Sequence, residues 1–134
     1  MKKSILIIGI VMLILIIPFL SVYAIRTAPK DKGAFSVDDY TAYIAEPNFR
    51  TERTYGAITD WKTAANIGKQ AIRDRFGKSA EGGLFEWMGC DVQYDTDNDA
   101  YYVRTYHVNP NVLGGAFDVI IKADGTILAI WGED

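Results

Sequence analysis

An uninterrupted apolar segment opens the chain and sets it apart from everything that follows. Ser4 to Ile25 are 22 consecutive uncharged residues, preceded by Lys2 and Lys3. About 20 apolar residues span a bilayer, whereas the apolar region of a secretory signal is usually about 7–15 residues long. Val22-Tyr23-Ala24 fits the small-residue pattern of a signal-peptidase site. Residues 1–24 are therefore predicted to be either a cleaved signal peptide or an uncleaved membrane anchor.

Either outcome exports the rest of the chain. We expect an extracytoplasmic body that is secreted, periplasmic or held at the cell membrane. Contact with the membrane is expected only through residues 4–25, and only if this segment is not removed.

The next segment, residues 25–55, has little hydrophobic periodicity. Arg26 to Ala34 combines Pro, Gly and alternating charges, which is typical of a tether. A capping-box pattern at Ser36 to Asp39 then precedes apolar residues at helical spacing, and Pro47 ends them. We expect a linker that carries one short helix.

The strongest helical pattern lies between Thr59 and Phe76. Small and apolar residues recur at i, i+3, i+4 and i+7, which places them on one face of a helix. These residues are Trp61, Ala64, Ala65, Gly68, Ala71, Ile72 and Phe76. Thr59 is the expected N-cap and Gly77 the expected C-cap. Because the middle of this face is small, the helix backbone should lie close to a sheet.

After Gly82 and Gly83 the hydrophobic period changes from 3.6 to 2. Aromatic and β-branched residues separated by short turns predict an antiparallel meander. The expected strands are Phe85–Tyr94, Tyr101–Val108, Ala116–Lys122 and Thr126–Trp131. One helix followed by four strands predicts an α+β domain over residues 56–134, in which the helix packs on a curved, cone-like four-stranded antiparallel sheet.

The Asp124-Gly125 turn fixes the register of the last two strands if its loop has two residues. The expected pairs are Ala123 with Thr126, Lys122 with Ile127, Ile121 with Leu128, Ile120 with Ala129, Val119 with Ile130, and Asp118 with Trp131. Phe117, Val119 and Ile121 then share one wholly apolar side. That side is expected to be core beneath the helix.

The opposite side of these strands is mixed in character and is the candidate binding surface. By strand alternation, each of the last three strands contributes polar or aromatic residues to it. The candidate partner-binding residues are Tyr102, Arg104, Tyr106, Asp118, Ile120 and Trp131. Tyr, Trp and Arg are enriched at binding hot spots, so we expect a partly solvated surface anchored by Trp131 and Tyr102. Ordinary cross-strand stabilisation would give the same pattern.

The charge of the body favours a basic protein partner. Residues 25–134 carry 12 basic and 17 acidic side chains, and from Glu81 to Asp134 there are 10 acidic and two basic residues. Such a surface would steer a basic protein towards it. The net charge of -3 excludes a basic nucleic-acid-binding protein.

A candidate calcium loop is incomplete. Asp95 to Asp99 offers oxygen ligands at alternate positions, but Ala100 and Tyr106 stand where the loop needs Gly and Glu. A solvated acidic hairpin turn is the expected structure.

Other catalytic or metal-binding patterns are also incomplete. The single Cys90 excludes a disulfide framework and a Cys-rich zinc site. His107, the only histidine, would be a general base if a carboxylate such as Asp118 lay beside it, although a structural histidine is more common on a strand. No catalytic residue, cofactor or metal is predicted.

Several blocks between Thr59 and Trp131 carry a family resemblance. They are, in order, Thr63-Ala64 with Ile67, Phe76-Gly77, Tyr102-Val103, and Gly114-Gly115 followed by Phe117 to Lys122 and Asp124 to Ile127. This order resembles the nuclear-transport-factor-2-fold immunity proteins of bacterial polymorphic toxin systems. The resemblance implies a helix on a curved antiparallel sheet, and a protein that neutralises a cognate toxin by binding it, without catalysis.

Three functions follow from these patterns. The first is a toxin-binding immunity protein. The second is an envelope module that regulates or assists a peptidase or another membrane protein. The third is a small-molecule enzyme that uses a cone-shaped pocket, which would require His107 and Asp118 to lie together.

Overall fold

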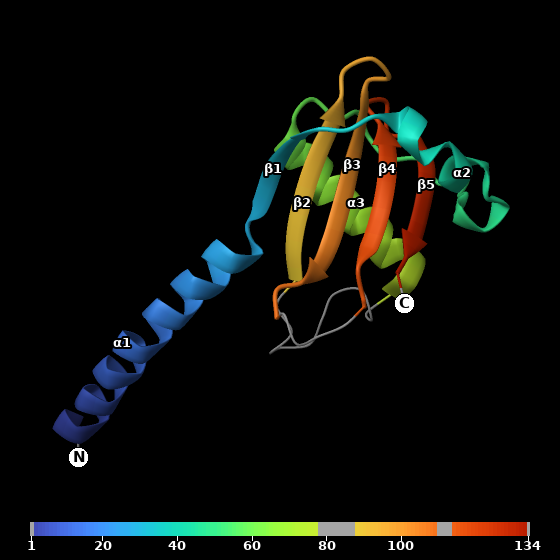
Figure 1. Cartoon of the computed structure of the whole chain (residues 1–134). Coiled ribbons are helices and arrows are strands. Elements are labelled where there is room, and N and C mark those ends of the chain that lie inside the picture. Colours follow the sequence, from blue (N-terminus) through green and yellow to red (C-terminus); the bar gives the residue numbers. More distant parts are fainter. Residues whose placement is uncertain (1, 78–87, 110–113, 134) are drawn as a thin grey trace.

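Five strands form one open, mixed sheet in the computed structural model, which describes residues 2–77, 88–109 and 114–133. The strands are β1 Pro29–Ala34, β2 Met88–Asp95, β3 Ala100–His107, β4 Phe117–Lys122 and β5 Ile127–Gly132, in that spatial order. β1 is parallel to β2, and all other neighbours are antiparallel. Helix α3, Trp61–Phe76, crosses one face of the sheet (Figure 1). The α+β prediction is confirmed, but the sheet has a fifth, parallel strand and does not close into a cone.

A long apolar helix precedes the sheet and projects away from it (Figure 1). This helix, α1 Lys2–Thr27, contains a 20-residue stretch, Lys3–Val22, that is long and apolar enough to cross a membrane. Its mean hydropathy is 3.2, and none of the stretch is buried against the body. An N-terminal segment of this kind is consistent with a signal sequence or an anchor.

The tether expected between Arg26 and Ala34 is wrong. α1 ends at Thr27 and β1 begins at Pro29, so Ala28 alone separates them. β1 pairs with the edge of β2, for example Pro29 with Cys90 and Ala34 with Tyr94. The sequence conceals this strand because Pro, Lys and Gly are poor strand formers. The same residues are typical of edge strands that resist pairing with other chains.

Helix α3 confirms the predicted face. Ala64, Ala65, Gly68, Ala71 and Ile72 are all buried against the sheet. A Cβ atom on Gly68 would lie 2.6 Å from Val103 Cγ1, so the helix backbone does approach β3 closely.

The caps of α3 confirm one prediction and correct another. The N-cap is Asp60 instead of Thr59, because the Asp60 carboxylate accepts a hydrogen bond from the Thr63 amide at 2.9 Å. Gly77 is the C-cap, with a φ of +71°.

The β4–β5 register is confirmed except beside the turn. Asp118, Val119 and Ile120 pair with the predicted partners Trp131, Ile130 and Ala129, but Ile121 pairs with Ile127 instead of Leu128. The loop holds three residues, because the Lys122 amide donates to Thr126 O at 2.8 Å and the Gly125 amide donates to Lys122 O at 2.8 Å. An irregularity after Ile120 then restores the predicted pairing.

A chain segment that we call the strap, residues 35–49, covers part of the other face. It contains three short turns of helix: η1 Val37–Tyr40, α2 Thr41–Ala45 and η2 Pro47–Phe49. Figure 1 shows it passing from β1 across the end of the sheet to the side of β5. The sheet therefore lies between two apolar clusters, one beneath α3 and one beneath the strap.

Candidate interaction surface

All six predicted partner-binding residues share the sheet face opposite α3. Tyr102 pairs with Ile120, and Arg104 pairs with Asp118, which in turn pairs with Trp131. Tyr106 follows on the same side of β3 by alternation. The prediction of a common face is confirmed.

The expectation that this whole face is partly solvated is wrong. Tyr102, Ile120 and Trp131 are only 7%, 0% and 4% exposed, and Asp118 is also fully buried. The strap covers them with aromatic side chains: the Tyr43 and Trp131 rings are 4.6 Å apart, and the Tyr40 and Tyr102 rings are 5.2 Å apart. Trp131 and Tyr102 therefore hold the strap in place and are not free surface anchors.

A chain of polar contacts leads from this buried layer to the surface. The Tyr102 hydroxyl donates to Asp118 Oδ1 at 2.6 Å, and Arg104 Nη1 lies 3.4 Å from the same oxygen. Arg104 also donates to both carboxylate oxygens of Glu133, at 3.1 and 2.6 Å. The side chains of Arg104 and Glu133 are 35% and 45% exposed. One arginine thus joins a buried carboxylate to an accessible one.

Asp118 is the fully buried carboxylate in this chain of contacts. Its Oδ2 atom is buried and has no hydrogen-bond partner among the described residues. Burial raises the pKa of Asp118 to about 6, although Tyr102 and Arg104 favour the ionised form. The arrangement keeps a carboxyl group close to its titration point at neutral pH.

We predict that Asp118 makes stability fall as pH rises from about 4 to 6. Its folded pKa of about 6 is above the ordinary value of 3.8. The stabilising proton is therefore fully present below pH 3.8 and is lost as pH rises through 6. Two pKa units correspond to roughly 3 kcal/mol of unfolding free energy. Urea unfolding of the wild type and Asp118→Asn across pH 4–7 measures this, and equal slopes for the two proteins would contradict the assignment.

A second polar pair lies on the part of the face that the strap leaves open. The Tyr106 hydroxyl donates to Asp91 Oδ1 at 3.1 Å. The Tyr106 ring lies over Gly89, where an added Cβ atom would come within 2.6 Å of the ring. Asp91 is also the direct neighbour of Arg104 across β2 and β3. We call Asp91, Arg104, Tyr106 and Glu133 the polar face.

Sequence reasoning missed two members of the polar face. Asp91 lies inside a predicted strand, and strand alternation combined with the β2–β3 register would have placed it beside Arg104. Glu133 follows the predicted end of the last strand, so no periodic signal assigned it to a side.

His107 and Asp118, which the small-molecule enzyme hypothesis requires to be neighbours, do not lie together. His107 lies on the α3 side of the sheet, because it alternates with Val103 and Thr105, whereas Asp118 faces the strap. Cys90 lies in the core beneath α3, and burial raises the pKa of its thiol to about 11. The described residues contain no group of three or more His, Cys, Asp or Glu side chains that could hold a metal ion.

The candidate calcium loop is a hydrogen-bonded turn whose first residue is buried. Asp95 accepts hydrogen bonds from the amides of Val37, Asp97 and Asn98 and from the Asn98 side chain, at 2.7 to 3.1 Å. These donors, the Val37 amide first, lower the pKa of Asp95. The expectation of a solvated turn holds for Thr96 to Asp99 and is wrong for Asp95, which is 5% exposed.

The described geometry defines an α+β protein with an N-terminal apolar helix and one partly covered sheet face. No family model, curated protein or solved structure matches the chain.

Proposed function

We propose that this chain is an exported protein-binding module, an immunity protein that neutralises a cognate bacterial toxin by binding it without catalysis. The polar face carries the proposal. It combines Tyr and Arg, which are enriched at binding hot spots, with two accessible carboxylates. The single observation behind the proposal is the bidentate ion pair between Arg104 and Glu133. Both side chains are partly exposed, and Arg104 also contacts the buried Asp118.

The polar face is held in place before a partner arrives. Tyr106 is tied to Asp91, and Arg104 is tied to Glu133 and to Asp118. Side chains that are already ordered lose little conformational entropy on binding, so more of the contact energy contributes to affinity.

The charge of the polar face supports a basic partner. Three carboxylates, those of Asp91, Asp118 and Glu133, lie near Arg104, and exposed Lys30 stands beside Asp91 in the β1–β2 register, so acidic groups outnumber basic ones there. Exposed Asp97 and Asp124 lie in the turns at the end of the sheet away from α1 (Figure 1). A negative field of this extent accelerates association with a basic protein and weakens as salt rises.

The N-terminal helix supports a location outside the cytoplasm. Because one residue separates α1 from β1, an uncleaved chain would hold the sheet close to the membrane. The proposed toxin would therefore act in the cell envelope or enter through it.

The test is the affinity of charge-neutralised variants for a partner identified by co-purification with the full chain. Glu133→Gln is expected to weaken binding about tenfold or more, because it removes an accessible carboxylate and releases Arg104. Asp97→Asn removes the same charge from an exposed turn and is the matched control, with an expected change below about threefold. Equal effects of the two variants would leave only a general charge effect and would contradict a site at the polar face.

An envelope accessory role is the second candidate, and the direct passage from α1 into β1 favours it. In that role the sheet would be mechanically joined to a membrane helix and would regulate or assist a peptidase or another membrane protein. Co-purification of a membrane protein, in place of a basic toxin, would select this alternative. A toxin-like or a peptidase-like reading frame beside the gene would separate the two in the same way.

A further inference from the structure

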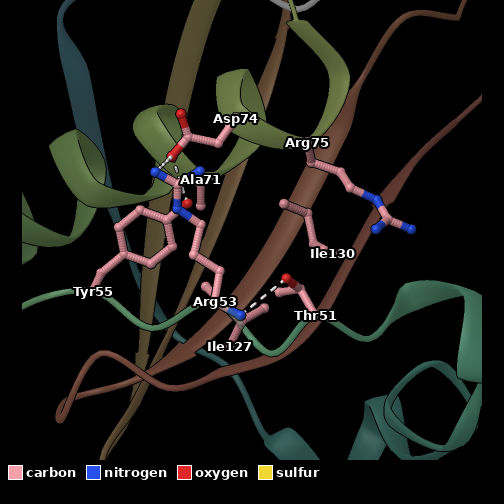
Figure 2. Close-up of a pocket in the computed structure, with 8 residues that line it drawn as sticks. All are labelled: Thr51, Arg53, Tyr55, Ala71, Asp74, Arg75, Ile127 and Ile130. Carbon is pink, nitrogen blue, oxygen red and sulfur yellow. Dashed lines mark hydrogen bonds and ion pairs between the residues drawn. The ribbon is translucent and has the colours of Figure 1, made fainter.

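A cavity of about 300 Å³ (Figure 2) is lined by residues of the cluster beneath α3, on the sheet face opposite the polar face. Its apolar floor consists of Ala71 from α3 with Ile127 and Ile130 from β5. The chain segment before α3 forms another wall with Arg53 and Tyr55. The function proposed above does not use this cavity.

Asp74 fixes one side of the cavity. Its Oδ2 atom accepts the Tyr55 hydroxyl at 2.7 Å and lies 3.4 Å from Arg53 Nη2, and its Oδ1 atom accepts a hydrogen bond from Gln70 at 2.8 Å. The hydrogen bond from Tyr55 is the main reason that the pKa of Asp74 is lowered. The Asp74 charge is therefore already satisfied, and its role is to hold Tyr55 and Arg53 in position.

Two guanidinium groups flank the floor. Figure 2 shows the Arg53 guanidinium beside Tyr55 and Asp74, and the Arg75 side chain on the far side of Ile130, extending away from Arg53. Arg75 donates to the backbone oxygen of Asn48 at 2.8 Å and has no carboxylate partner among the described residues. The Arg53 side chain is 62% exposed. A guanidinium has five N–H donors, so both arginines retain unused donors.

The surrounding charge reinforces this arrangement. Arg50 to Phe76 contains six basic and three acidic side chains, in contrast to the acidic C-terminal half of the chain. The lining itself carries two arginines and one aspartate, so it has a net positive charge on a protein with a net charge of -3. An anion is the ligand that this local field favours.

We propose that this cavity binds a small organic carboxylate, with the carboxylate on Arg75 and an apolar group on Ile127 and Ile130. The planar fork of a guanidinium matches a carboxylate with two parallel hydrogen bonds. The volume is at the lower limit for ligand pockets, which favours a single ring or a short branched chain. A neutral apolar molecule would leave the guanidinium donors unused, and a bare inorganic anion would leave the apolar floor unused.

The experiment titrates benzoate into the full chain held in lipid nanodiscs and follows amide chemical shifts. Saturable binding is expected, with shifts in the amides of residues 71–75 and 127–130. Benzamide, which has the same ring without the charge, and inorganic phosphate, which has charge without the ring, are each expected to bind at least tenfold more weakly.

Variants separate this site from nonspecific attraction and from uptake into the lipid. Arg75→Gln should raise the dissociation constant of benzoate about tenfold or more. Lys62→Gln removes the same charge from the same helix outside the cavity, and should change the constant less than twofold. Absent saturation, equal effects of the two variants, or equally tight binding of benzamide or phosphate would each overturn the proposal. None of these results depends on the toxin or on the polar face.

Discussion

Trp131→Ala is expected to lower the free energy of unfolding by about 3–5 kcal/mol, as removal of a large buried aromatic does. Trp131 is 4% exposed. Its ring lies 4.6 Å from that of Tyr43 and 5.9 Å from that of Phe49. The substitution would empty the centre of the cluster beneath the strap. Urea unfolding of residues 25–134, followed by circular dichroism, measures the loss, because this fragment retains all five strands.

Tyr43→Ala is the matched control for this prediction. Tyr43 packs on the same tryptophan from the strap, but it is 41% exposed, so its removal should cost about 1 kcal/mol. A loss for Trp131→Ala no larger than that for Tyr43→Ala would show that the strap does not pack as described. A large loss also means that Trp131→Ala is unsuitable for locating a partner site, since a weaker complex would then reflect unfolding.

Local patterns were sufficient to predict the elements that have strong periodicity. Helix α3 was predictable because Ala64, Gly68 and Ile72 recur at helical spacing, and the side of each strand was predictable because alternation has a period of exactly two residues. One register error arose beside Gly125, where a three-residue loop is as compatible with Asp-Gly as a two-residue loop. The bulge that follows the loop limited the error to one end of the hairpin.

The elements that the sequence patterns did not predict depend on contacts between residues that are distant in sequence. β1 has no strand pattern of its own and is stable only because β2 supplies its hydrogen-bond partners. The strap has weak helical periodicity, and its aromatic residues gain their position by packing on β3 and β5. Alternation therefore identified the face that bears Trp131 and Tyr102, but not the segment that covers it. The part of that face that stays exposed, including Glu133, can be identified only when the position of the strap is known.

Asp95→Ala is expected to lower the free energy of unfolding by about 2–4 kcal/mol, because hydrogen bonds to a charged group contribute about 1.5–3 kcal/mol and their loss leaves buried donors unpaired. Asp95 is 5% exposed, and its two oxygens accept four hydrogen bonds. One donor is the Val37 amide, 58 residues away at the start of the strap. The substitution would thus loosen the β2–β3 turn and the strap together.

Asp97→Ala provides the control within the same turn. Asp97 is exposed, so its replacement should change stability by less than about 0.5 kcal/mol. The effect of Asp95→Ala should also depend on pH. The pKa of Asp95 is lowered from its ordinary 3.8, so its stabilising contribution is present above that value and is lost as pH falls through the folded pKa. Urea unfolding at pH 7 and near pH 2 measures this, and the gap between Asp95→Ala and the wild type should narrow at the lower pH. Equal losses for Asp95→Ala and Asp97→Ala at pH 7 would show that the turn is solvated throughout and that the strap is not tied to it.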